Sequence, residues 1–344
     1  MRWEPFYRIM LARIKEPLRE PEVLFWVFVF PLIMAVGLGV AFRNKPPEKI
    51  AVTVIEGPRA EATAKALSAS PLLTISVETE RDARRDLRLG KAALVVSADD
   101  ADYAYIFDPT RPESALARSD VEDALQKAGG RKDVFEAKDV TLSEPGARYI
   151  DFLIPGLLGM NLMSGGLWGV GFAVVDMRTR KLLKRLVASP MRKSEFVAGV
   201  MTSRVLFMLV ELVLLLTFGY FVFDVAVRGS IAATVFVGLL GALSFGAIGI
   251  LVASRAQKIE TVSGLMNLVM LPMFVFSGIF FSSDRFPQIM QPFIHALPLT
   301  MLNDALRSII IEGSSLASQR YELGGLALWG LVSFVLAVRW FRWT

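Results

Sequence analysis

The chain contains no cysteine and only one histidine, His295, among its 344 residues. The lack of cysteine excludes disulfides, thiol catalysis and thiolate metal ligands, and a single histidine excludes a histidine-rich metal site. His295 is interpreted as a structural residue rather than a proton relay. The sequence also lacks a Walker motif, so the chain cannot hydrolyse ATP by itself. We therefore expect a non-catalytic protein that holds no cofactor of its own.

Hydrophobic residues make up 53% of the sequence, and the mean hydropathy of +0.48 is high for a soluble protein of this length. The apolar residues gather in blocks of about 20, the number that a helix needs to cross a ~30 Å hydrocarbon core. We predict six transmembrane helices, at residues 23–42, 152–175, 196–223, 231–253, 262–281 and 321–341.

The predicted fold class is an α-helical polytopic membrane protein with six transmembrane helices and a small extracytoplasmic α/β domain. Four divisions are predicted: an amphipathic interfacial helix at 1–20, a transmembrane helix at 21–42, the α/β domain at 43–148, and five further transmembrane helices at 149–344. The first apolar block resembles a signal peptide, but it is long enough to span the bilayer, and Pro5, Pro17 and Pro21 precede it.

Basic residues are distributed unevenly between the two sides of these spans. They are frequent before the first span, between the second and third, between the fourth and fifth, and in the tail, while the other connections are poorer in them. Cytoplasmic segments carry the excess of Lys and Arg, so both termini are expected in the cytoplasm of a bacterial cell, with the protein in the inner membrane. The net charge of +5 favours anionic membrane lipid, and not nucleic acid, as the partner.

Residues 43–148 are soluble in character. Short β-branched runs predict strands at 50–55, 73–77, 92–96 and 103–107, and helical patterns lie between them at 60–68, 81–89 and 114–127. Alternating strands and helices indicate a small α/β domain. It contains neither a glycine-rich phosphate loop nor a cluster of catalytic residue types.

Residues 178–190, RTRKLLKRLVASP, predict a short amphipathic helix. Its expected apolar face holds Leu182, Leu183, Leu186 and Val187, and its basic face holds Arg180, Lys181, Lys184 and Arg185. Ser189 and Pro190 end it. Such a helix either docks into a groove on a soluble partner or rests on lipid headgroups, and the pattern alone does not separate these alternatives.

The stretch after the fifth span, residues 277–313, is interrupted by Pro287, Pro292 and Pro298 and is too polar to cross the membrane. Leu299, Leu302 and several neighbours are nevertheless too apolar for free solvent. We predict external re-entrant helices at 282–312, packed against protein where the backbone is irregular.

Several motifs, in order and spacing, resemble those of the type-2 ABC exporter permeases. LKRLVASP at 183–190 is similar to the coupling-helix motif of that family. Phe-Ser-Gly at 276–278, with Phe280 and Phe281, precedes PLT at 298–300 and DALR at 304–307. GKAALVV at 90–96 and FDPT at 107–110 are similar to the external domain of that family. The chain departs from the family just before the coupling motif, where Thr179 to Leu182 replace an acidic residue followed by Gly-Thr.

The resemblance implies a homodimer of permeases docked on two ABC ATPase subunits, which would bind the ATP and Mg. It implies an ATPase-coupling site at Leu182, Leu183, Lys184, Arg185, Leu186, Val187, Ser189 and Pro190. It also implies a dimer interface along the second and fifth spans, so that cysteines placed at Leu153 or Ile279 would crosslink between protomers.

Three polar residues inside predicted spans are candidates for the substrate path or the dimer interface: Asn161, Glu211 and Asn267. A charge at mid-bilayer costs at least ~2.5–3.5 kcal/mol, so Glu211 must face protein or water. Arg204 lies two turns earlier and is expected to be too distant for a direct ion pair. The two asparagines suit hydrogen bonds between helices better than substrate ligation.

Two other classes of membrane protein are compatible with parts of the pattern. An ion-driven secondary transporter would show internal repeats and several mid-membrane ionisable groups, but no repeat is visible and Glu211 stands nearly alone. A membrane-anchored sensor could use the α/β domain to bind a ligand, but it would not need the basic helix at 178–190. The substrate is not evident from the sequence.

Overall fold

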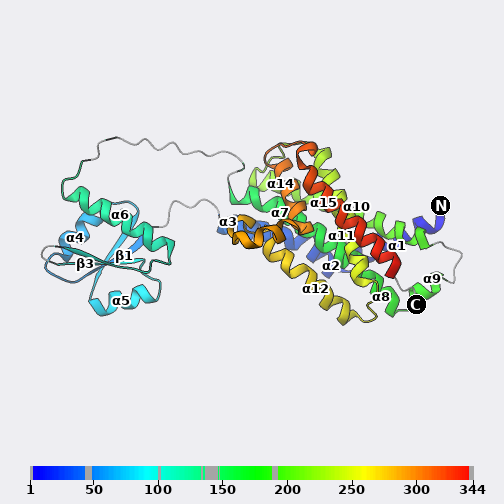
Figure 1. Ribbon diagram of the computed structural model, residues 1–344, viewed down its shortest axis with the longest axis horizontal. Coiled ribbons are helices and arrows are strands. Elements are labelled where there is room, and N and C mark those ends of the chain that lie inside the picture. Colours follow the sequence, from blue (N-terminus) through cyan, green and yellow to red (C-terminus); the bar gives the residue numbers. More distant parts are fainter. Residues whose placement is uncertain are drawn as a thin grey trace. The chain divides into compact units, whose positions relative to one another are not determined.

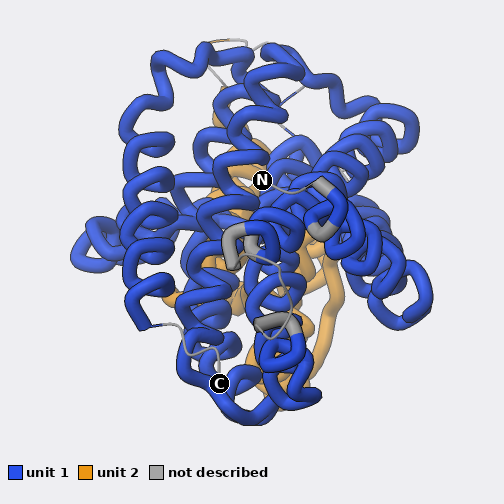
Figure 2. Tube along the Cα trace, turned by 90° about the vertical axis from the view of Figure 1, so that its right-hand side faces the viewer, with its two compact units in different colours: residues 1–43, 143–344 blue, residues 44–142 orange. Residues whose placement is uncertain are grey.

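The computed structural model describes residues 3–42, 49–99, 102–132, 135, 146, 148–187 and 193–340. The chain forms two compact units (Figure 2), one of residues 1–43 with 143–344 and the other of residues 44–142. Each unit has its own hydrophobic core, and each is described by itself below.

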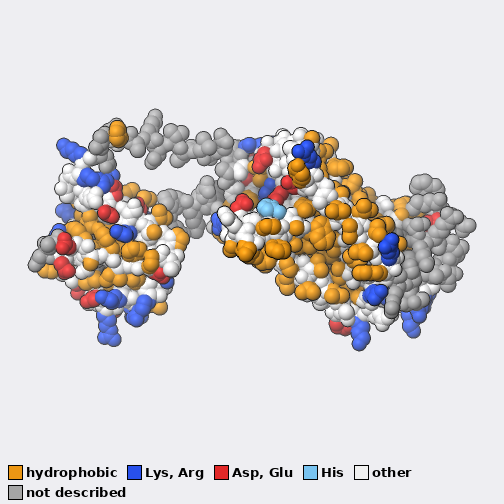
Figure 3. Space-filling view, in the orientation of Figure 1, with side chains coloured by type: hydrophobic (Ala, Val, Ile, Leu, Met, Phe, Trp, Pro, Cys, Tyr) orange, Lys and Arg blue, Asp and Glu red, His pale blue; other side chains and the backbone are white. Residues whose placement is uncertain are grey.

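Six helical segments of the first unit are long and apolar enough to cross a membrane, which confirms the predicted number of spans. They are Pro21–Ala41, Tyr149–Thr179, Ala198–Phe223, Ile231–Ala253, Ile259–Phe276 and Leu316–Trp340. Side chains on the visible face of this unit are mostly hydrophobic along its middle, with charged groups toward its ends (Figure 3).

The first two spans are not uniform α-helices. The first joins α2 (Pro21–Leu24), the π-helix η1 (Phe25–Val29) and α3 (Phe30–Ala41). The second joins α7 (Tyr149–Gly166), the π-helix η2 (Leu167–Phe172) and α8 (Ala173–Thr179). The remaining spans lie in α10 (Lys193–Phe223), α11 (Ile231–Ala253), α12 (Ile259–Phe276) and α15 (Arg320–Trp340).

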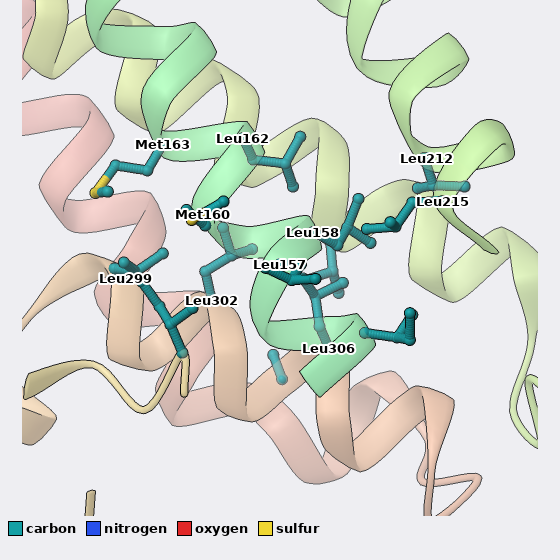
Figure 4. Packing of buried hydrophobic residues seen from close by; sticks show 14 of the residues in the cluster. Leu157, Leu158, Met160, Leu162, Met163, Leu212, Leu215, Leu299, Leu302 and Leu306 are labelled. Atoms are coloured by element: carbon teal, nitrogen blue, oxygen red, sulfur yellow. The ribbon is translucent and has the colours of Figure 1, made fainter. Parts of the chain in front are cut away.

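The second and fourth spans form the centre of the helical unit. They are each 61% buried, against 17–28% for the other four. Glycines allow this close packing, since a Cβ on Gly249 would lie 2.5 Å from the carbonyl oxygen of Gly166. Leucines of α7, including Leu157 and Leu158, pack against α10 and α14 (Pro298–Ile310) in the same core (Figure 4).

The fifth span ends at Phe276, five residues earlier than predicted. Ser277 and Gly278 follow in a turn, and Gly278 has a φ of +68°, a left-handed conformation that glycine adopts without strain. Short helices then replace a long one: η3 (Ser283–Arg285), η4 (Gln288–Met290), α13 (Gln291–His295), α14, and η5 (Leu316–Gln319).

The N-terminal helix α1 (Trp3–Leu18) lies within the range 1–20 predicted for an amphipathic helix. It packs against the start of α10, where a Cβ on Gly199 would lie 2.9 Å from the Ile9 side chain. The chain then turns at Glu20 and Pro21 and enters the first span.

In its described residues, the second unit is a four-stranded sheet with three helices, which confirms the predicted α/β pattern. Strands β1 (Ile50–Ile55), β2 (Leu73–Glu78) and β3 (Leu94–Ala98) are parallel, and β4 (Tyr103–Ile106) pairs antiparallel with β3, in the order β2-β1-β3-β4. Helices α4 (Ala60–Leu67) and α6 (Pro112–Ala128) cover one side and α5 (Glu80–Arg88) the other (Figure 1). Val52, Val54 and Leu94 are fully buried in this core.

Candidate functional site

A cavity of about 940 Å³ lies in the helical unit between the first, second, third and fifth spans, with α1 at one edge. Most of its wall is apolar, and much of it is aromatic. The aromatic side chains that line it are Trp26, Phe28, Phe30, Trp168, Phe172, Phe207 and Phe274. A space of this size between helices suits a small organic molecule.

Both π-helical segments contribute to this cavity. Trp26, Val27 and Phe28 come from η1, and Trp168 comes from η2. A π-turn inserts a residue into the helix and shifts the side chains that follow, and such turns are frequent at functional sites. The indole Nε1 of Trp168 donates a hydrogen bond to the sulfur of Met270 at 3.0 Å, which ties the second span to α12 across the cavity wall.

Arg204 and Glu211 form a buried ion pair on α10 beside this cavity. Nη1 of Arg204 lies 2.6 Å from Oε1 of Glu211, and Nη2 lies 3.0 Å from Oε2. The expectation that these residues are too far apart was therefore wrong. The two Cα atoms differ by about 10 Å along the axis, but a helical side chain leans toward the N-terminus, so Glu211 approaches the long arginine. The side chains are 7% and 1% exposed.

The second span is shaped to receive this pair. Nη2 of Arg204 also donates to the backbone oxygen of Asn161 at 3.3 Å. A Cβ on Gly165 would lie 2.1 Å from the guanidinium carbon, so only glycine leaves room for Arg204 in this position. The side-chain nitrogen of Asn161 in turn donates to the carbonyl oxygen of Val27 at 3.4 Å, which joins the first span to the second.

Of the three polar candidates, the structure brings together two. Asn161 and Glu211 both line the cavity and are linked through Arg204. Asn267 is exposed on α12, and its side chain makes no hydrogen bond within the described residues. No group of three or more potential metal ligands occurs among the described residues.

The predicted coupling segment begins at a tightly held arginine. Arg178 donates to the carbonyl oxygen of Ala253 at 2.9 Å, to that of Ser254 at 3.2 Å, and to that of Ala256. The oxygens of Ala253 and Ser254 are unpaired carbonyls at the C-terminus of α11, which a cation stabilises, and Ala256 lies in the turn that follows. Arg178 thereby fixes the end of the second span to the end of the fourth.

The helix of this segment, α9, is shorter than predicted, at Leu182–Val187. Leu183 is fully buried against Val175 and Phe196, whereas Leu182 is 37% exposed and Lys184 and Arg185 are exposed. Leu182 and Leu183 were both expected on one apolar face, but only Leu183 is buried. Adjacent residues on a helix point about 100° apart, so the two leucines face different surroundings. The side chains of Leu186 and Val187 are outside the described part, as are the residues Ser189 and Pro190.

Sequence comparison identifies the family. Residues 21–339 match the profile of the ABC-2 family transporter proteins. The chain belongs to the ABC-2 transporter family. It is therefore a multi-pass membrane subunit of an ABC transporter, and membership of this family implies an ATPase partner.

Two relatives illustrate the range of the ABC-2 family. The chain is 26% identical over 199 residues to ABC transporter G family member 20 of Dictyostelium discoideum, which covers 56% of this chain but only 27% of that protein. It is 20% identical over 339 residues to the probable multidrug ABC transporter permease YbhS of Escherichia coli K12, covering 91% of this chain and 90% of the relative.

One arginine of α14, Arg307, contacts both the start of the second span and the turn that follows the fifth span. Nε of Arg307 donates to the backbone oxygen of Phe152 at 3.4 Å, another guanidinium nitrogen donates to that of Gly278, and the guanidinium carbon lies 3.7 Å from the centre of the Phe152 ring. Asn303 adds a 2.8 Å hydrogen bond to the Ser277 oxygen. Burial lowers the pKa of Arg307 to about 10, so it stays charged at neutral pH.

On sequence grounds Arg204 was rejected as the partner of Glu211, and the capping role of Arg178 was not identified. A charged side chain in an apolar run needs a partner of opposite charge. Arg204 lies seven residues before Glu211, and that spacing could have identified it as the partner. Nothing in the local sequence indicates which carbonyls Arg178 binds, because they lie about 75 residues further along the chain.

Proposed function

We propose that this ABC-2 permease is the membrane subunit of an ATP-driven exporter, which forms the substrate path as a homodimer and is moved by two ABC ATPase subunits. ATP and Mg bind to the partner, and this chain holds no cofactor. The observation that carries the proposal is the continuity of the second span, since one helix from Tyr149 to Thr179 lines the cavity and leads directly into the predicted coupling segment.

The contacts at the end of this helix suit it for transmitting force. A push on α9 reaches α8 through the buried Leu183, and Arg178 carries the movement to the end of α11. The π-helix η2 lies between α8 and the Arg204 contact with Asn161. Packed helices respond to such a push by discrete shifts rather than by gradual bending, so movement at α9 would change the cavity wall.

We further propose that both termini lie in the cytoplasm of a bacterial cell, with the protein in the inner membrane and the α/β unit outside. One end of the helical unit holds α1, α8, α9 and the turn between α11 and α12 (Figure 1). Basic residues gather at this end, and include Arg8, Arg13, Lys15, Arg19, Arg178, Arg180, Lys184, Arg185, Arg255 and Lys258. The positive-inside rule supports a cytoplasmic location for it.

Substitution of Leu182 tests the coupling. Leu182→Asp places a charge on an exposed apolar position of α9, and we expect it to reduce co-purification of the ATPase and ATP turnover by about tenfold or more, the cost of an unpaired charge in a buried contact. Leu116→Asp is the matched control, because Leu116 is an exposed leucine on α6 of the α/β unit. Unchanged association in both variants would support the lipid-anchor alternative for this segment.

A further inference from the structure

We propose that the cavity binds an amphipathic organic cation, that is, a molecule with an apolar body and one positive charge. This inference rests on the proposed function and names the substrate class of the same permease. It follows from the charges that line the cavity, from its aromatic wall, and from where the unbalanced charges lie.

Acidic side chains outnumber basic side chains in the lining of the cavity. Three arginines and five carboxylates line the cavity. Each arginine is paired with one of the carboxylates: Arg13 with Glu16 at 2.7 Å, Arg180 with Asp176 at 2.9 Å, and Arg204 with Glu211 at 2.6 Å. The two carboxylates that remain are those of Glu20 and Glu22, which make no ion pair within the described residues. The lining therefore carries a net charge of about −2, and an anion would find each lining cation already neutralised.

The wall of the cavity suits the body of such a molecule. Trp26, Phe28, Trp168 and Phe274 offer aromatic faces, which attract both apolar groups and cations. A positive charge held over a tryptophan or phenylalanine ring is attracted to the negative face of the ring, most strongly where water is excluded. A neutral ligand would use the same wall but would gain nothing from the carboxylates.

The positions of the two free carboxylates fit an amphipathic shape. Glu20 and Glu22 are exposed and flank Pro21, where α1 ends and the first span begins. Trp26 and Phe28 follow one to two helical turns further into the span. A cationic head near the carboxylates would thus leave an apolar body against the aromatic residues, in the direction of the Arg204–Glu211 pair.

Two ions of matched size and opposite charge test the inference. Tetraphenylphosphonium and tetraphenylborate are compared for binding to the purified full-length protein in nanodiscs, after subtraction of binding to protein-free nanodiscs. The variant E20Q/E22Q removes the unpaired carboxylates at exposed positions. The control E4Q/E312Q removes the same number of exposed carboxylates that do not line the cavity.

The expected result is that the wild-type protein binds the cation about tenfold more tightly than the anion. E20Q/E22Q should weaken cation binding by about tenfold, and E4Q/E312Q should leave it unchanged. Equal or tighter binding of the anion, or full cation affinity in E20Q/E22Q, would overturn the inference. Co-purification of the ATPase with the same proteins reports on the proposed function separately, because it needs neither ion.

Discussion

At the scale of single residues, Arg204 and Glu211 place two charges inside the third span, and both side chains are buried. A lone ionised group at this depth costs several kcal/mol, and the pair avoids that cost by cancelling its charge within one helix. The oxygen of Asn161 accepts a further hydrogen bond, and Gly165 leaves the space that the guanidinium group fills. The pair is therefore part of the packing between the second and third spans as well as a polar part of the cavity wall.

Removing one member of this pair should be worse than removing both. We expect Glu211→Leu to destabilise the protein by about 3–5 kcal/mol, because Arg204 would remain as a buried charge without its partner. The double variant R204M/E211L replaces the pair by apolar groups and should cost much less. Chemical unfolding in detergent micelles, analysed as a double-mutant cycle with Arg204→Met, measures the difference. Additive effects of the two single substitutions would show that the ion pair is not the stabilising unit.

At the scale of elements, most helices and strands could be predicted from local pattern. The amphipathic period of α1 and the strand–helix alternation of residues 50–128 depend on which residues must be buried, and that is visible in the sequence. The π-helices η1 and η2 were not predicted, because they depend on contacts with helices distant in the chain. The early end of the fifth span depends likewise on the turn at Gly278, which Arg307 holds from α14.

The candidate site was only partly predictable for a similar reason. Glu211 was identifiable because a carboxylate among leucines is costly wherever it points. The difference in burial between Leu182 and Leu183 could not be predicted, because a helix of six residues is too short for its periodicity to define a face. The cavity itself arises where four spans and α1 meet, and no local pattern describes that arrangement.

The segment after the fifth span depends on the shape of the Arg307 side chain. Its planar guanidinium group reaches the oxygens of Phe152 and Gly278 and also stacks on the Phe152 ring. Lysine keeps the charge but cannot reproduce this geometry. We expect Arg307→Lys to raise amide hydrogen exchange in residues 277–297 by about tenfold to a hundredfold, equivalent to losing a hydrogen bond of a charged group.

Arg285→Lys is the control for that measurement, because Arg285 is exposed on η3 in the same segment. It should leave the exchange of residues 277–297 unchanged. An equal increase in both variants would mean that the effect is not specific to the contacts of Arg307 with Phe152 and Gly278.

At the scale of the whole molecule, the spans differ in how much of their surface the protomer covers. The span of α12 is 22% buried, and Leu268, Leu271 and Val275 are more than half exposed on it. The third span also exposes apolar residues, including Val213. Lipid or a second protomer can cover such a surface, and the ABC-2 resemblance favours a second protomer for α12. Leu153 and Ile279, the first choices for crosslinking, are buried within the protomer and cannot reach a partner.

Val275 is therefore the better position for testing the homodimer. It lies near the end of α12 and is 56% exposed. The chain has no cysteine of its own, so a disulfide between two permease chains that carry this single cysteine must join the two copies of position 275. We expect Val275→Cys to form a covalent dimer in native membranes on mild oxidation, because a disulfide needs Cβ atoms about 3.5–4.5 Å apart and an interface along α12 brings the copies together. Val213→Cys, with 60% exposure on the third span, is the matched control and should stay monomeric on denaturing gels. A dimer that forms through Val213 and not through Val275 would place the interface on the third span, and the substrate path between protomers would then have to be sought there.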